Sequence, residues 1–168
     1  MSTNNKIVLT ITEYMSELLY DIENKTFLTG KSRKNGNNYE EVANMQANEN
    51  DEDLNQILRS VGNAWGTVQK EVSEYFPTDT ALAGAPNNIL QANSNLSMTL
   101  WMPLNYNKAS DGLIATAIHQ YIVNTAVGDW FAITNKNDAG DYYKESANNL
   151  MELREAINRR KRPERTTV

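Results

Sequence analysis

The stretch TFLTGKSRKNG, residues 26–36, contains the Gly30-Lys31-Ser32 triplet that ends a phosphate-binding P-loop. A complete P-loop needs another glycine at position 25, where this chain has Lys25. It must also follow a buried strand and open a helix. Here the preceding residues have helical spacing and KNGNNY, which follows, has loop composition. We therefore interpret the stretch as a basic surface loop, disordered in a free monomer, whose cations are Lys31, Arg33 and Lys34.

No other group of residues predicts catalysis or metal binding. His119 is the only histidine, and no serine or carboxylate at a fixed offset marks it as a base, so we expect a surface or partly buried side chain. One histidine without cysteine excludes the usual transition-metal ligand sets. The acidic run Asn48–Asp53 lacks the turn glycine of a calcium loop, so it is interpreted as a solvated helix start. The sequence predicts a non-enzyme with no cofactor, metal or small-molecule substrate.

Size and composition indicate one domain, residues 1–168, without a membrane segment. The 168 residues suffice for one core, and no apolar run approaches the roughly 18–20 residues that span a bilayer. The start MSTNNK lacks the apolar part of a signal peptide. Absence of cysteine suits assembly in a reducing cytoplasm. The net charge of -5 argues against wholesale coating of nucleic acid.

Two helices are predicted in the first half of the chain. The first covers Thr10 to about Asn24, with Thr10 and Glu13 at capping-box spacing. Residues 25–50 form an Asn-rich loop or arm, within which residues 38–48 are either a short helix or an irregular connection. The second helix covers about Asp51 to Phe76 and has a seven-residue apolar repeat. The repeat predicts the packing face of a bundle helix or a seam against another chain; its members are Leu54, Leu58, Val61, Trp65, Val68, Val72 and Tyr75.

Residues 77–108 are predicted to contain a linker, 77–88, and a β-hairpin. The strand Leu96–Leu104 alternates strictly between apolar and other residues. A turn at residues 93–95 would pair it with Ile89–Ala92. Because a lone hairpin is marginal in water, it must pack on the helices or pair with another subunit. Pro103 favours an edge position.

Two more helices complete the predicted fold. One starts near Ser110 as N-cap, runs towards Trp130-Phe131 and has a wide apolar stripe, so we expect it to be the central helix. The other runs from Asp138 to about Arg160. Its inward positions are predicted to be Ala139, Tyr143, Ala147, Leu150, Leu153 and Ile157. The expected fold class is mainly α, a bundle of about four helices with a small β-hairpin inserted between helices two and three.

The C-terminal segment 159–168 is a basic tail. Its five cations exceed what capping a helix C-terminus requires. They indicate a solvated tail, contacts with nucleic-acid phosphates or docking on an acidic protein surface. Asn48–Asp53 offers the opposite charge, so head-to-tail contact between identical subunits could close a ring.

The C-terminal third resembles the closing helices of tailed-bacteriophage virion proteins, especially head–tail connector (adaptor or neck) proteins, including those of phages that infect Bacteroides-type gut bacteria. The similarity lies in residues 129–163, DWFAITNKNDAGDYYKESANNLMELREAINRRKRP, where an aromatic helix end, a short break and a helix ending in basic residues follow one another. The long Asn-rich 25–50 segment and the heptad helix depart from that pattern.

The resemblance implies a structural virion protein, assembled in the host cytoplasm, that forms a ring on the portal and extends the DNA channel. Its partners would be further copies of the chain, the portal or other neck and tail proteins, with non-specific contact to packaged DNA. The alternative is an intracellular helical binding module that uses its basic C-terminus on nucleic acid or an acidic partner. The candidate contact residues are Lys31, Arg33, Lys34, Leu96, Met98, Leu100, Trp101, Met102, Arg159, Arg160, Lys161, Arg162 and Arg165.

Overall fold

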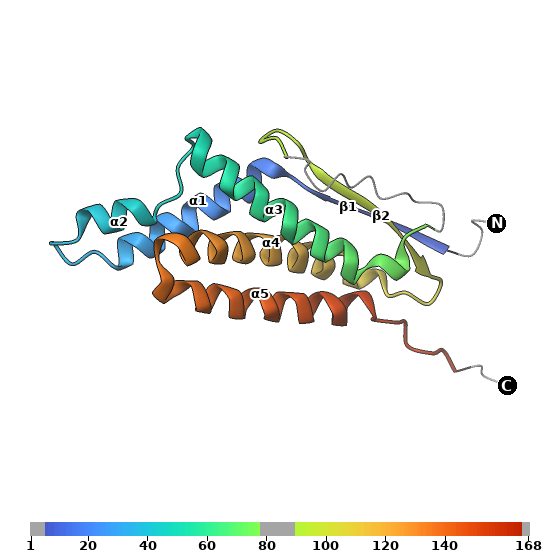
Figure 1. Cartoon of the computed structure of the whole chain (residues 1–168). Coiled ribbons are helices and arrows are strands. Elements are labelled where there is room, and N and C mark those ends of the chain that lie inside the picture. Colours follow the sequence, from blue (N-terminus) through green and yellow to red (C-terminus); the bar gives the residue numbers. More distant parts are fainter. Residues whose placement is uncertain (1–5, 78–89, 166–168) are drawn as a thin grey trace.

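The computed structural model describes residues 6–77 and 90–165, and the chain is mainly helical (Figure 1). Within these residues five α-helices occur instead of about four, because part of the predicted arm folds as a helix. The elements in order are β1 (Lys6–Glu13), α1 (Met15–Ser32), α2 (Tyr39–Met45), α3 (Asp51–Glu71), the 3-10 turn η2 (Ser73–Tyr75), β2 (Leu96–Pro103), the 3-10 turn η3 (Lys108–Ser110), α4 (Asp111–Thr134) and α5 (Lys136–Ile157).

Helix α4 is the centre of the bundle, as its wide apolar stripe predicts. It packs against α5, α3 and α1, and it also contacts β1 (Figure 1). Ile114, Ile118, Ile122 and Phe131 are fully buried along it. Ser110 precedes the helix as predicted, but its hydroxyl makes no capping hydrogen bond.

The heptad positions pack inside their own chain, although α3 ends at Glu71 and not at the predicted Phe76, so that Val72 and Tyr75 lie just beyond it. Leu54 is partly buried, and the six positions from Leu58 to Tyr75 are buried in the same core as α4. The bundle interpretation of the repeat is therefore correct, and the seam against another chain is not needed to cover it.

Among the described residues the sheet has two antiparallel strands, and the predicted hairpin partner of β2 is wrong. Strand β2 lies between α3 and α4 in the sequence, and not between the second and third helices, because α2 adds one helix before it. It pairs along its length with the N-terminal strand β1. The register places Lys6 opposite Pro103 and Glu13 opposite Leu96. The turn-forming residues 93–95 predict a pairing between neighbouring segments, whereas the observed pairing joins segments that are far apart in the sequence. Ile89 and most of the predicted linker lie outside the described residues.

The first helix begins and ends later than predicted. Residues 6–13, KIVLTITE, form a strand because their buried and exposed positions alternate and β-branched side chains favour a pleated surface. The capping-box interpretation of Thr10 and Glu13 is therefore wrong. Helix α1 continues to Ser32, through residues that were predicted to be loop.

Helix α5 buries fewer of its predicted inward positions than expected. Ala139, Leu153 and Ile157 are buried and Leu150 is partly buried, whereas Tyr143 and Ala147 are exposed. The Tyr143 hydroxyl instead donates a hydrogen bond of 2.6 Å to Asp129 on α4. Partial desolvation of the phenol and this hydrogen bond raise the pKa of Tyr143 to about 12.

Candidate functional site

The Gly30-Lys31-Ser32 triplet forms the last turn of α1 and not a phosphate loop. The Ser32 hydroxyl donates to the Thr29 carbonyl at 2.7 Å, within the same helix. Gly30 is buried where α2 crosses α1: a Cβ atom there would lie 3.1 Å from the Val42 carbonyl oxygen. The glycine therefore permits close packing of α2 on α1. The rejection of a nucleotide site at this triplet agrees with its helical geometry.

The turn between α1 and α2 is held by its asparagines, so the expectation of a disordered loop is wrong for residues 33–38. The Asn38 side chain accepts from the Asn35 amide at 2.9 Å and donates to the Arg33 carbonyl at 2.8 Å. Asn35 in turn accepts from the Asn37 amide at 3.0 Å. Gly36 has a φ of 90°, a left-handed conformation that glycine adopts without steric cost.

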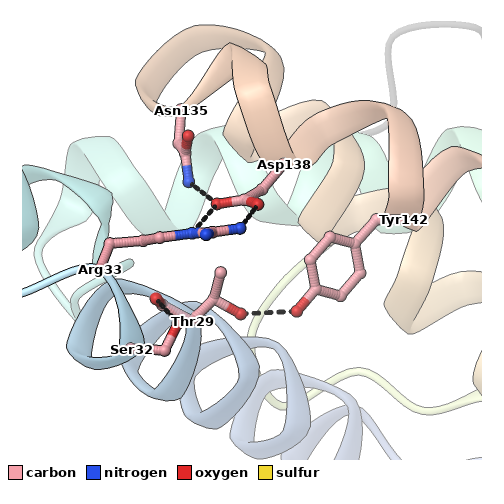
Figure 2. Close-up of polar contacts among 6 residues, drawn as sticks. All are labelled: Thr29, Ser32, Arg33, Asn135, Asp138 and Tyr142. Atoms are coloured by element: carbon pink, nitrogen blue, oxygen red, sulfur yellow. Dashed lines mark hydrogen bonds and ion pairs between the residues drawn. The ribbon is translucent and has the colours of Figure 1, made fainter.

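Arg33 pairs with a buried acid on α5 (Figure 2). Its Nη2 donates to Asp138 Oδ1, and its Nε donates to Asp138 Oδ2 at 3.0 Å, so the contact is bidentate. The Asn135 side chain also donates to Asp138, and the Tyr142 hydroxyl meets the Thr29 hydroxyl at 2.6 Å beside it (Figure 2). Arg33 lowers the pKa of Asp138. This candidate contact residue thus joins α1 to α5 within one chain.

A groove lies between the end of α1 and α2. It has a volume of about 260 Å³ and is lined by Phe27, Lys31, Lys34, Tyr39, Val42, Ala43 and Gln46. The Lys31 ammonium lies 5.9 Å from the centre of the Phe27 ring, and the Lys34 ammonium lies 4.8 Å from that of Tyr39. Both distances are within the range of cation–π attraction. Two of the predicted contact residues therefore stand at an aromatic groove.

Four of the predicted strand contacts are buried within the chain. Leu96, Met98, Leu100 and Met102 face the helices and belong to the core, so their side chains are not open to a partner in this fold. Trp101 lies on the opposite face of β2, half-buried, and opposite Val8 of β1. Of the five predicted strand contacts, Trp101 alone keeps a side chain that a partner could contact.

The basic tail is anchored at its beginning and exposed beyond it. The backbone amide of Lys161 donates to the Asn105 carbonyl at 2.6 Å, and the Asn107 amide donates to the Arg159 carbonyl at 3.3 Å. The Arg160 guanidinium donates to the Tyr75 hydroxyl at 3.1 Å and to the Ile157 carbonyl at 3.0 Å. Arg160 therefore forms hydrogen bonds within its own chain and stabilises the fold. The other predicted tail contacts are exposed: Arg159, Lys161, Arg162 and Arg165.

The exposed cations of the tail and the exposed acids at the start of α3 lie towards opposite ends of the molecule. The tail leaves α5 at the end away from the α1–α2 turn, while α3 begins on the α2 side (Figure 1). Asp51 and Glu52 are exposed in the first turn of α3. Asn50 caps this helix by accepting from the Asp53 amide at 2.8 Å, which agrees with the predicted helix start in the acidic run.

A histidine cluster that the sequence did not reveal joins three elements. His119 of α4 contacts Glu13 of β1 through Nδ1 at 2.9 Å and Asp21 of α1 through Nε2 at 2.6 Å. Hydrogen bonding to Glu13, together with Asp21, raises the pKa of His119 against the opposing effect of burial. Both ring nitrogens are used by carboxylates, an arrangement that suits an imidazolium holding β1 and α1 to α4. No local spacing could have identified it, because the three residues come from distant segments.

Lys25, at the position where a P-loop would need glycine, is half-buried in a second polar cluster. Its ammonium donates to Asn124 Oδ1 at 2.8 Å, and Asn124 donates to Asn149 Oδ1 at 2.8 Å. Burial lowers the pKa of Lys25, while Asp21 and Glu145 act in the opposite direction. The cluster connects α1, α4 and α5.

In residues 6–77 and 90–165, no three histidine or acidic side chains are arranged to hold a metal ion, and no helix could cross a membrane. Comparison with models of known protein families, with curated proteins and with solved structures finds no match to this chain.

Proposed function

We propose that this chain is a non-enzymatic structural protein that joins copies of itself head to tail into a ring. The observation that carries the proposal is the separation of charge: exposed cations of the tail at one end, and exposed acids at the start of α3 towards the other. A head-to-tail contact would bring the two together, and such a contact closes a ring when its rotation permits.

The ring is proposed to be a head–tail connector of a tailed-phage virion, docked on the portal and extending the DNA channel. Support for this identity is the resemblance of residues 129–163 to connector proteins. The helix–break–helix order expected there corresponds to α4, Asn135 and α5. The place of action would be the virion, after assembly in the host cytoplasm.

Sedimentation velocity of the full chain tests self-assembly. The monomer has a mass of 19.0 kDa, and we expect larger species at low ionic strength. The double substitution Arg162→Glu and Arg165→Glu should return the chain towards monomer, whereas Arg59→Glu with Lys70→Glu, on the exposed face of α3, should not. A wild-type chain that stays monomeric at every concentration contradicts the proposal.

Mass spectrometry of purified particles tests the virion assignment. Virions of the phage that encodes this chain should contain it at a copy number matching a ring. Its absence from complete particles would reject the connector role while leaving self-assembly to be judged by sedimentation.

The four exposed tail cations favour a second candidate, a helical module that binds nucleic acid. Binding to a fluorescent DNA duplex should then weaken steeply with salt, because cations at phosphates release counterions. Arg159→Ala combined with Arg162→Ala should lower both the affinity and the salt slope. Binding that does not change with salt would exclude this function.

A further inference from the structure

The aromatic groove between α1 and α2 has the character of a docking surface. Helix α2 has seven residues and buries none of them, and an isolated helix of that length is unstable in water. At the groove, Phe27 is 42% exposed and Tyr39 is 60% exposed. The chain therefore keeps a short helix and two large aromatic side chains open to solvent at one end of the molecule.

The groove is also held in shape before any partner arrives. Gly30 lets α2 approach α1, and the Trp130 indole of α4 donates to the Met45 carbonyl at the end of α2, at 2.8 Å. The asparagine-bonded turn fixes the other end of α2. A surface that is already ordered loses little conformational entropy on binding.

The charge and lining of the groove specify the chemistry of its occupant. Lys31 and Lys34 stand beside the aromatic rings, so an occupant should carry carboxylates. The apolar lining has room for a bulky side chain, and methionine is suited to it because its thioether makes favourable contacts with aromatic rings. The expected occupant is a helix face with an apolar residue next to acids.

The outer face of α5 matches this description. Met151 is 56% exposed, and the exposed acids Glu152 and Glu155 lie one and four residues further along the helix. This face directly precedes the basic tail. On the receiving side, α2 also carries the exposed acids Glu40 and Glu41. The order of charges is therefore complementary: acids on α5 followed by the basic tail would face Lys31 and Lys34 followed by the acids of α2.

We propose that the α1–α2 groove receives the α5 helix of the next copy of this chain, with Met151 between Phe27 and Tyr39 and with Glu152 and Glu155 facing Lys31 and Lys34. This inference rests on the proposed head-to-tail assembly and identifies its surfaces. It places the groove and the tail in the same heterologous interface. One copy contributes the groove at its α1–α2 end, and the next copy contributes the C-terminal half of its α5 together with the tail that follows.

Charge reversal and rescue test the inference in the full chain. Lys31→Glu with Lys34→Glu, and separately Glu152→Lys with Glu155→Lys, should each raise the apparent dissociation constant about tenfold or more in sedimentation velocity. The chain with all four substitutions should recover assembly, because each interface again joins opposite charges. Circular dichroism should show unchanged helicity in every variant.

Matched controls separate this surface from others. Met151→Asp should weaken assembly, while Leu113→Asp, at an apolar position on α4 that is 49% exposed, should not. Glu17→Lys reverses a charge on a different exposed surface of α1, one turn from the exposed Tyr20, and should have no effect.

The outcomes distinguish the inference from the function on which it rests. A wild-type chain that never assembles overturns both. Assembly that responds to the tail substitutions but not to the groove or α5 substitutions overturns the groove contact alone. Disruption by both double variants without recovery in the fourfold variant rejects the pairing of these two surfaces.

Discussion

His119 is enclosed by acids from two other elements, and its protonation should affect the stability of the fold. The Glu13 side chain is 6% exposed and the His119 side chain 21%, so the contact is shielded from solvent. A charged imidazolium can donate to both carboxylates at once, whereas a neutral ring has a single N–H. Loss of the proton therefore leaves one carboxylate without its donor.

The resulting pH dependence follows from the direction of the shift. Because folding raises the pKa of His119, its stabilising effect is fully present below the unfolded-state pKa of about 6.5 and is lost as the pH rises through the folded-state value. His119→Gln should lower the unfolding free energy by about 1–3 kcal/mol at about pH 6 and by less at about pH 9. Urea denaturation at the two pH values measures this.

A control isolates the cluster from other titrating groups. The chain has one histidine, so no second imidazole can produce the effect. Glu17→Gln, an exposed acid of α1, should change stability equally at both pH values. A loss for His119→Gln that is the same at both pH values would contradict a protonated cluster.

At the scale of elements, the contact of Asp138 with Arg33 and Asn135 fastens the end of α1 to the start of α5. Asp138→Ala should lower the unfolding free energy by about 1–2 kcal/mol, because it removes charge-assisted hydrogen bonds of a buried group. Asp141→Ala, an exposed acid one turn along, should change it by less than about 0.5 kcal/mol. Equal effects of the two substitutions in urea denaturation would argue against the bidentate contact.

The orientation of β2 gives a separate test. Leu100 is 0% exposed, so Leu100→Ala should destabilise the chain by about 2–5 kcal/mol through lost burial and the cavity left behind. Thr99→Ala, on the outer face, should cost less than about 0.5 kcal/mol. Thermal or urea unfolding of the two variants distinguishes the faces, and reversed effects would mean that the strand is turned over.

The sequence predicts elements well where their residues pack on a periodic face. The heptad of α3, the wide stripe of α4 and the alternation of β2 each appear in the fold, because burial follows the helical or strand period. Strand β1 was missed because Ile11, Met15, Leu18 and Ile22 continue one helical spacing across the strand–helix boundary.

The candidate contacts were less predictable, because exposure depends on tertiary packing. Alternation in β2 marks one apolar face without saying whether helices of the same chain cover it. Likewise, the sequence shows that Arg33 and Arg160 are cationic, but their partners Asp138 and Tyr75 lie far away along the chain. The cluster of His119, Glu13 and Asp21 was unpredictable for the same reason.

At the scale of the whole molecule, assembly through exposed charges should depend on salt. Charges at a surface are screened within roughly 10 Å at 0.1 M ionic strength and within roughly 3 Å at 1 M. The mass-average size of the full chain should therefore fall as sodium chloride is raised from about 50 mM to about 500 mM. Size that rises with salt in light scattering would indicate apolar association instead.

The pairing of β1 with β2 also governs events during synthesis of the chain. Thr10 and Thr99 face each other across the sheet although they lie 89 positions apart in the chain. At roughly 5–20 residues per second, a ribosome needs about 4–18 s to make that intervening length. The N-terminal strand thus leaves the exit tunnel long before its partner exists, with an apolar row of Ile7, Leu9 and Ile11 uncovered. Nascent chains should consequently need protection by a ribosome-associated chaperone until β2 emerges.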